Sequence, residues 1–244
     1  MGVQEWLTNS NYTVVFTGAG MSTESGLPDF RSKKEGLWRK KDPNRIASTQ
    51  ALNENVQEFI EFYRERVLGV KEFSPHRGHY ILADWERRGI IRSIITQNVD
   101  GFHTQAGSQR VAELHGTLLK LHCQSCGKEF DSEKYVNKSY YCDECGGVLR
   151  PNVVLFGEML PQNAFQMALE ETEKADLFIV LGSSLTVSPA NQFPLLAKQH
   201  GAKLVIVNME PTEFDGFADE VIHGRKIGEV LAEWDEYLKQ HLPN

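Results

Sequence analysis

The four cysteines of this 244-residue chain form two pairs, Cys123-x-x-Cys126 and Cys142-x-x-Cys145. This spacing is typical of a zinc ribbon, in which two tight turns each offer two thiolates to a tetrahedral ion. Two disulfides are the alternative, and they are disfavoured because the N-terminus carries no secretion signal. Four thiolates fill the coordination sphere and leave no position for water or substrate. The cysteines therefore predict one zinc ion with a structural role.

Two glycines follow the apolar run 13–16, which has the composition of a buried strand. Gly18 and Gly20 would let the backbone turn sharply and approach a ligand closely. A helix beginning near Ser22 would then direct free N–H groups at a phosphate. The dinucleotide fingerprint Gly-x-Gly-x-x-Gly is matched only in part, because Thr23 occupies the third glycine position. An ordinary glycine turn is the alternative interpretation.

Other polar residues stand where they could reach the same ligand. Asp29 and Arg31 lie on a loop just beyond the glycine turn, and Asn98 and Asp100 follow the next apolar strand. The last two could orient a ligand amide and a water, or form a solvated turn. His115 precedes a glycine, so its ring could project into the same crevice as a base. A hydrogen-bonded core histidine is the alternative.

Hydrophobic periodicity predicts the elements that carry these residues. Strands are predicted at 13–16, 90–95, 153–156, 177–181 and 204–207, with a short apolar segment at 111–114. Helices are predicted at 2–10, over 56–67, from Ser74-Pro75 to Gly89, between 156 and 177, and over 227–238. Residues 32–47 lack periodicity and are predicted to form a lid or a plain surface loop. The alternation of strands and helices predicts an α/β fold with a doubly wound parallel sheet, which binds ligands where its strands end.

Composition narrows the class of protein. The chain is 41% hydrophobic and carries a net charge of −7, which indicates a globular protein and argues against a nucleic-acid binder. No apolar run approaches the roughly 20 residues of a membrane span. Without a targeting signal, the chain is expected to be cytoplasmic, with no membrane partner.

In type and order these motifs resemble those of the sirtuins, a family of NAD-dependent protein lysine deacylases. The resemblance is carried by Gly18–Ser22, Gly26–Arg31, Thr96–Asp100, His115-Gly116, the two cysteine pairs and Gly182–Leu185. Each motif alone is weak, but their combination is specific and spans nearly the whole chain, as in bacterial catalytic cores. The family implies a Rossmann-like domain at 1–31, 76–118 and 151–244. It also implies a small inserted domain, with a lid loop and helical module at 32–75 and the zinc ribbon at 119–150.

The resemblance also implies the roles of individual residues. NAD is expected to contact Gly18, Ala19, Gly20, Thr23, Asp29, Phe30, Arg31, Gln97, Asn98, Val99, Asp100, His115, Gly182, Ser183, Ser184, Asn208, Lys226 and Ile227. His115 and Asn98 are the implied catalytic residues, with His115 as general base toward the ribose hydroxyls. The segment with Val154, Phe156, Gly157 and Glu158 is expected to receive the substrate peptide as an added strand, although it also reads as a core strand.

The implied reaction consumes NAD and converts an acyl-lysine protein, most simply an acetylated one, to free lysine, nicotinamide and O-acyl-ADP-ribose. Tyr63 and Arg66 resemble the pair that reads a succinyl or malonyl carboxylate, so an acidic acyl group is an alternative. A hydride-transferring oxidoreductase is disfavoured, because the third glycine and an acidic residue about 20 positions later are missing. A zinc-ribbon binding module is a third possibility. The enzyme is expected to be a monomer.

Overall fold

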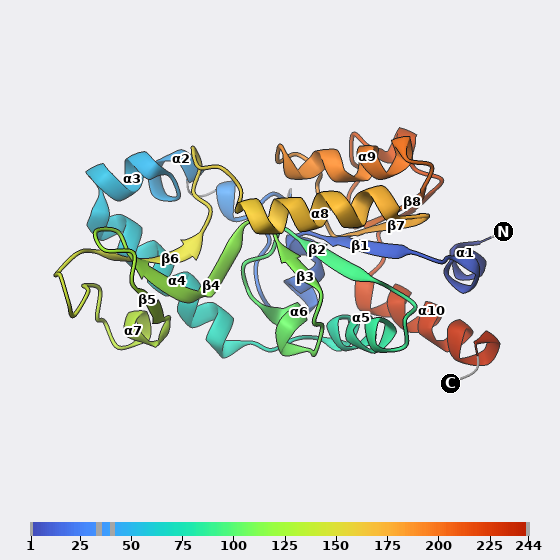
Figure 1. Cartoon of the computed structure of the whole chain (residues 1–244), viewed down its shortest axis with the longest axis horizontal. Coiled ribbons are helices and arrows are strands. Elements are labelled where there is room, and N and C mark those ends of the chain that lie inside the picture. The colour runs from blue at the N-terminus through green and yellow to red at the C-terminus, as the bar shows by residue number, and fades with distance from the viewer. Residues whose placement is uncertain (1, 33–35, 40–41, 243–244) are drawn as a thin grey trace.

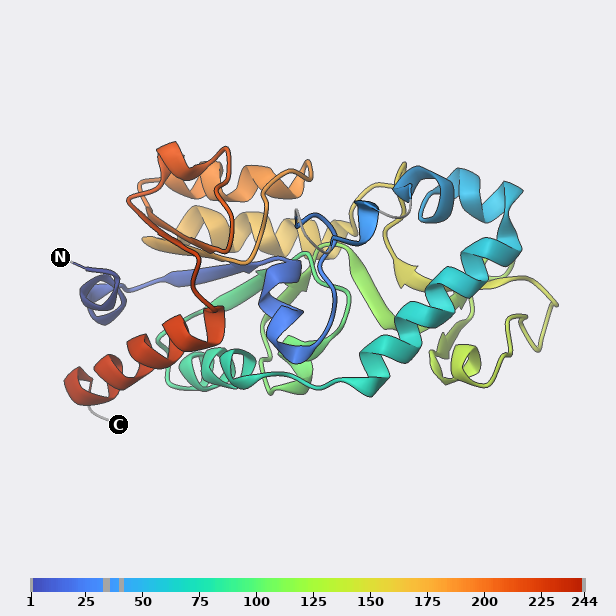
Figure 2. The ribbon, with the colours of Figure 1, turned by 180° about the vertical axis from the view of Figure 1, so that it is seen from behind.

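The computed structural model describes residues 2–32, 36–39 and 42–242, and it consists of two lobes side by side (Figures 1 and 2). The larger lobe contains six parallel strands in the order β3-β2-β1-β7-β8-β9. The strands are β1 (Thr13–Thr17), β2 (Ser93–Thr96), β3 (Val111–Glu113), β7 (Leu177–Leu181), β8 (Lys203–Asn208) and β9 (Glu220–His223). The chain reverses its direction of winding between β1 and β7, as in dinucleotide-binding sheets. The predicted doubly wound parallel sheet is confirmed.

Helices cover both faces of this sheet (Figure 1). One face packs on α1 (Val3–Asn9), α5 (Arg77–Arg87) and α10 (Ile227–His241), and the other on α8 (Gln162–Lys174) and α9 (Phe193–Gln199). The central strands β1 and β7 are buried at every position, which explains their unbroken apolar sequences. The short helix α6 (Phe102–Gln105) lies against α5.

The smaller lobe combines an antiparallel sheet with helices, so the predicted inserted ribbon and helical module are confirmed. Its sheet has the order β5-β4-β6, with β4 at Gly116–Cys123, β5 at Glu129–Asp131 and β6 at Leu149–Val153. Its helices are α2 (Pro43–Ile46), α3 (Thr49–Glu54), α4 (Val56–Glu72) and α7 (Glu133–Val136). The apolar stripe of α4, with Phe59, Tyr63 and Val67, packs on β4 and β6. The domain limits expected at 118 and 151 fall inside β4 and β6, which pair from Gly116–Val153 to Cys123–Leu149.

Several local predictions are wrong. The helix expected near Ser22 is a 3₁₀ helix that begins at Ala19, η1 (Ala19–Ser25). The helix expected to begin at Ser74-Pro75 begins at Arg77, because the His76 ring caps it by accepting a hydrogen bond from the Gly78 amide at 3.0 Å. β2 begins at Ser93 rather than at residue 90.

Three more differences concern irregular or exposed segments. The strand expected at 153–156 ends at Val153. The loop predicted for 32–47 contains the 3₁₀ helix η2 (Leu37–Arg39) and α2, while residues 33–35 and 40–41 lie outside the described residues. The edge strand β9 was not predicted, because its side chains are only half-buried or exposed. Two further 3₁₀ helices are η3 (Ala190–Gln192) and η4 (Asp215–Phe217). Within the described ranges, no helix is long and apolar enough to cross a membrane.

Candidate active site

A cavity of about 840 Å³ lies between the two lobes, at the carboxyl ends of the central strands. Its floor is the glycine turn after β1, the loop after β2 and the turn after β7, which meet where the winding of the sheet reverses. Open α/β sheets bind their ligands at this point. The smaller lobe contributes α4 and the residues after β6 to the opposite wall.

The two glycine turns of the floor are packed backbone to backbone. The Gly20 amide donates to the carbonyl oxygen of Gly182 at 2.8 Å. A Cβ on Gly18 would stand 2.7 Å from that same oxygen, and Gly182 has a φ of +64°. No larger residue fits at these positions. Ala19, Ser183 and Ser184 begin the two turns, and their amides donate to no acceptor within the described residues. Unpaired backbone amides in glycine turns that line a cavity suit an anionic diphosphate, so the predicted NAD fits the floor.

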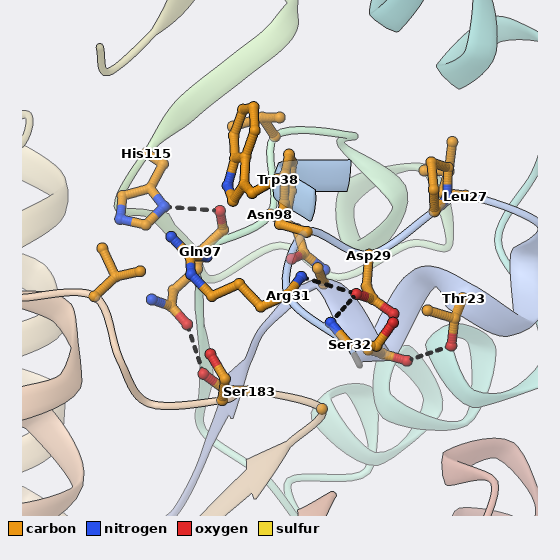
Figure 3. A pocket seen from close by; sticks show the side chains of 18 of the residues that line it. Thr23, Leu27, Asp29, Arg31, Ser32, Trp38, Gln97, Asn98, His115 and Ser183 are labelled. Carbon is orange, nitrogen blue, oxygen red and sulfur yellow. Dashed lines mark hydrogen bonds between the residues drawn. The ribbon is translucent and has the colours of Figure 1, made fainter. Parts of the chain in front are cut away.

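Most residues expected at the cofactor line this one cavity. They are Ala19, Gly20, Thr23, Asp29, Phe30, Arg31, Gln97, Asn98, Val99, His115, Gly182, Ser183, Ser184, Asn208, Lys226 and Ile227. Gly18 and Asp100 do not line it but lie directly behind residues that do. Figure 3 shows the side chains of Arg31, Gln97 and His115 converging on one part of the cavity.

A buried hydrogen-bond network fixes Asn98. Its Nδ2 donates to the Gly18 carbonyl oxygen at 3.0 Å and to Ser22 Oγ at 3.2 Å. Ser22 Oγ donates in turn to Asp100 Oδ2 at 2.7 Å, and Asp100 Oδ1 accepts from the Phe102 amide at 2.9 Å. Burial raises the pKa of the Asp100 carboxyl. Asn98 thus lines the cavity with its amide nitrogen held in place, while Asp100 acts from behind as an anchor.

His115 lies between β3 and β4 with its ring in the cavity (Figure 3). Its Nδ1 is 3.0 Å from the Gln97 carbonyl oxygen, so Nδ1 carries the proton and Nε2 keeps its lone pair. Nε2 has no hydrogen-bond partner within the described ranges. Burial, assisted by the Arg31 charge, lowers the pKa of His115, which favours the neutral ring. The side chain is therefore prepared to accept a proton from a ligand in the cavity.

The loop after η1 is shaped by Asp29. Its Oδ1 accepts from the backbone amides of Arg31 at 3.0 Å and Ser32 at 2.8 Å (Figure 3). Both hydrogen bonds accepted by Asp29 lie within the loop. They hold Phe30 against Trp38, and the centroids of the two rings are 5.1 Å apart. Asp29 therefore acts on the cavity by holding this loop in place.

Tyr63 and Arg66 reach the cavity from α4. The Arg66 guanidinium lies 4.8 Å from the centre of the Phe30 ring. Burial raises the pKa of Tyr63 and lowers that of Arg66. Within the described part of the chain, neither the Tyr63 hydroxyl nor the Arg66 guanidinium has a hydrogen-bond or ion-pair partner. The polar ends of the buried Tyr63 and the half-buried Arg66 are thus left available to a ligand.

The segment expected to receive a peptide, 154–158, runs along the cavity wall. The Val154 amide donates to the His115 carbonyl oxygen at 2.9 Å, and the Phe156 amide donates to the Ala47 carbonyl oxygen at 3.0 Å. The segment is therefore extended and bonded on one side to both lobes. Phe156 is exposed at 39%, in agreement with a segment that lines a groove rather than a core strand.

The four cysteines form one cluster at the far end of the small sheet. Their Sγ atoms all lie within 4.8 Å of one another, with Cys123 and Cys145 3.4 Å apart and Cys126 and Cys142 3.8 Å apart. These separations exceed the roughly 2.0 Å of a disulfide bond. They suit four thiolates at about 2.3 Å from a tetrahedral zinc, whose sulfurs are about 3.8 Å apart. The predicted structural zinc fits this donor set.

Sequence reasoning missed several cavity residues. Trp38, Phe62 and Leu118 line the apolar part of the cavity, and Val187 and Met209 line the part near the turns after β7 and β8. Trp38 lies in the segment that was predicted as a loop, and Phe62 lies in the helix predicted over 56–67, where no role was predicted for it. The sequence pattern did not mark Trp38 as a cavity residue, because its contact with Phe30 forms only in the tertiary fold.

Comparison with known proteins identifies the family. Residues 18–189 match the Sir2 family. An NAD-dependent protein deacetylase from Oceanobacillus iheyensis is 68% identical over 229 residues, which cover 94% of this chain and 97% of the relative. This chain belongs to the Sir2 family. A second relative is NAD-dependent protein deacetylase 1 of Geobacillus kaustophilus. It is 59% identical over 240 residues, which cover 98% of this chain and 99% of the relative.

Solved Sir2 structures share the fold. One described as Sir2–p53 peptide–NAD⁺ has a TM-score of 0.87 and 37% identity, covering 97% of this chain and 98% of the other. A second Sir2 structure holds deacetylated p53 peptide and 3′-O-acetyl ADP-ribose, with a TM-score of 0.90 and 36% identity over 98% of this chain and 97% of the other.

Proposed function

We propose that this chain removes acyl groups from protein lysines in a reaction that consumes NAD, with acetyl-lysine as the main substrate. The supporting observation is that His115, whose Nε2 has no partner among the described residues, lines the same cavity as the two glycine turns and the segment 154–158. A nucleotide site, a base and a peptide groove therefore share one cavity. The Sir2 relatives named as NAD-dependent protein deacetylases support this assignment.

NAD would supply a ribose carbon at which the acyl oxygen of the acyl-lysine replaces nicotinamide. The residues of the chain contribute position and proton transfer. The glycine turns would hold the diphosphate of NAD, and Asn98, fixed through its Nδ2, would help to position the nicotinamide end. His115 Nε2 accepts the proton of a ribose hydroxyl, while its Nδ1–H stays on the Gln97 carbonyl. Enclosure between the lobes keeps water from the reacting atoms.

The test is mass spectrometry of an acetylated peptide incubated with NAD. Free lysine, nicotinamide and O-acetyl-ADP-ribose should appear in equal amounts, and omission of NAD should abolish all three. Formation of reduced nicotinamide instead, followed by its absorbance, would favour the oxidoreductase alternative. Binding of DNA with a steep salt dependence, without turnover, would favour the zinc-ribbon binding module.

A second candidate activity is removal of acidic acyl groups. Tyr63 and Arg66 support it, because both line the cavity and keep their polar ends without partners among the described residues. The Arg66 guanidinium, on a half-buried side chain, has no ion-pair partner among the described residues, and a carboxylate matches its planar fork. A succinyl or malonyl group reaching this wall would supply the missing anion.

Acetylated and succinylated versions of one peptide distinguish the two activities. If Tyr63 and Arg66 read a carboxylate, Arg66→Met and Tyr63→Phe should lower kcat/KM for the succinylated peptide at least about tenfold more than for the acetylated one. Arg87→Met is the matched control, because that side chain is 76% exposed on α5. Equal loss of both activities would refute the carboxylate-reading role.

A further inference from the structure

An ion pair with little exposure joins strand β6 to the end of segment 154–158. Arg150 on β6 places Nη2 2.9 Å from Glu158 Oε1, and the two side chains are 10% and 26% exposed. Most other ion pairs of the described residues involve at least one side chain that is about half exposed. An ion pair held away from water is screened little, and removing one partner leaves an uncompensated charge. This pair is therefore built to hold a defined geometry.

Arg150 is fixed on its other edge by the small sheet. Its Nε donates to His122 Nε2 at 3.1 Å, and the opposite ring nitrogen of His122 lies 2.5 Å from Asn152 Oδ1. His122 is on β4 and Asn152 is on β6, so the guanidinium is anchored to both strands. The sheet that carries the cysteine cluster thus determines where Arg150 points.

Glu158 uses both of its oxygens inside the protein. Oε1 meets Arg150, and Oε2 accepts from the Leu155 amide at 2.9 Å. The Glu158 amide donates back to the Leu155 carbonyl oxygen at 3.0 Å. Gly157, with a φ of +96°, closes this turn. The carboxylate therefore fixes the conformation of the segment rather than presenting a free charge to a peptide.

The turn decides which backbone groups the segment can offer. Val154 and Phe156 use their amides toward His115 and Ala47. The Val154 carbonyl and the Gly157 amide have no hydrogen-bond partner within the described ranges. These two groups are available to an extended peptide, whose affinity would come from main-chain hydrogen bonds.

We propose that Arg150 is a positioning residue for peptide binding: through Glu158 it holds segment 154–158 in the shape that accepts the substrate strand. This proposal rests on the proposed deacylase function. Arg150 does not line the cavity, so its loss is expected to reach the peptide through the segment that it holds. The nucleotide floor, built on Gly18, Gly182 and Ser183, lies on the other lobe and is left intact.

The test measures steady-state kinetics with an acetylated peptide and NAD for Arg150→Met, Arg150→Lys and Glu158→Gln. Arg150→Met should raise the KM for peptide about tenfold or more, with the KM for NAD and kcat within about twofold of wild type. Arg150→Lys keeps the charge and should recover part of the loss, and Glu158→Gln should follow Arg150→Met. Arg88→Met is the control, because Arg88 is also little exposed (14%) and ion-paired but lies on the far face of the large lobe.

The outcomes separate the two proposals. A peptide KM within twofold of wild type in both Arg150→Met and Glu158→Gln would overturn the positioning role, as would an equal rise in the KM for NAD. A rise in the peptide KM for Arg88→Met as large as for Arg150→Met would assign the effect to general destabilisation. Wild-type protein without NAD-dependent turnover would overturn the proposed function itself. If Arg150→Met does not fold, Glu158→Gln and Arg150→Lys decide the outcome.

Discussion

Nδ1 of His115 lies 3.0 Å from the backbone carbonyl oxygen of Gln97, and this contact fixes which ring nitrogen is basic. The side chain of the same glutamine accepts a hydrogen bond from Ser183 Oγ at 2.7 Å. Gln97 therefore connects the base to the glycine turn after β7. A nucleotide that orders this turn would also steady the ring that acts on it.

His115→Ala and His115→Tyr should keep the fold and the metal but lose most deacylation. General base catalysis contributes about 10²–10⁴-fold, so kcat/KM should fall by at least about two orders of magnitude. Product formation by mass spectrometry measures the loss, and zinc content measures the integrity of the ribbon. His200→Ala, on an exposed helix end, is the control. A His115 variant with near wild-type turnover would contradict the base assignment.

Loss of the metal should unfold the small sheet rather than change the chemistry directly. Cys145→Ser removes one of four thiolates, and zinc contributes on the order of 10 kcal/mol to the folding of small metal modules. Zinc content and the melting temperature should fall together with activity. Because the ion has no open position, exchange of zinc for cobalt should leave kcat within about twofold. A large change in kcat upon exchange would indicate a catalytic metal.

Gly116→Ala should be strongly destabilising. Gly116 has a φ of +74°, and a Cβ there would stand 1.9 Å from the Asn152 carbonyl oxygen. The substitution would force β4 away from β6 and displace the adjacent His115, so both the melting temperature and turnover should fall. Gly69→Ala on α4 is the matched control, because nothing lies within 4 Å of its added Cβ. That change should stabilise the helix by about 0.5–1 kcal/mol. Similar effects from both substitutions would contradict the steric argument.

Two buried histidines should make the protein less stable in acid. Burial lowers the pKa of His79 to about 2 and that of His103 to about 3. The unfolded chain protonates its histidines below about pH 6.5, so below that pH it binds more protons than the folded chain. Each histidine then lowers the free energy of unfolding by about 1.4 kcal/mol per pH unit. Glu113, whose pKa burial raises to about 7, acts in the opposite direction between about pH 7 and 4.5.

Comparison of the wild-type protein with a His79 variant isolates the contribution of this histidine to the pH dependence of stability. Both ring nitrogens of His79 are buried without partners among the described residues, so His79→Asn removes a buried titrating group. Denaturant unfolding at pH 7.5, 6 and 5 should show the stability difference between the two proteins shifting toward the variant as the pH falls. A difference that is independent of pH would show that His79 titrates normally in the folded state.

The sequence predicted what depends on local patterns. β1 and β7 were found because central parallel strands are apolar on both faces, and the zinc cluster because its ligands come in fixed short spacings. The start of α5 was misplaced because the cap of that helix is a tertiary arrangement. His76 accepts from the Gly78 amide while its other nitrogen bonds the Met21 carbonyl at 2.7 Å. Ser74-Pro75 offered a better local signal and was not used.

The parts of the site that sequence reasoning did not resolve arise from side-chain contacts that only the fold brings together. Glu158 was expected to face the peptide, but its partner Arg150 on strand β6 gave no signal in the sequence. Asp100 was expected to contact the cofactor, yet it lies behind Ser22. In both cases the residue type identified a polar site, while only the fold shows which way the polar atoms point.

Strand β4 connects the active-site base to the metal cluster. It begins one residue after His115 and ends on Cys123, so a single extended stretch joins the proton acceptor to the metal cluster. A zinc ion that takes no part in the reaction would thereby fix the orientation of the His115 ring from the opposite end of β4. Slow zinc loss would then be felt first as misdirected chemistry, before the nucleotide-holding lobe loses its shape.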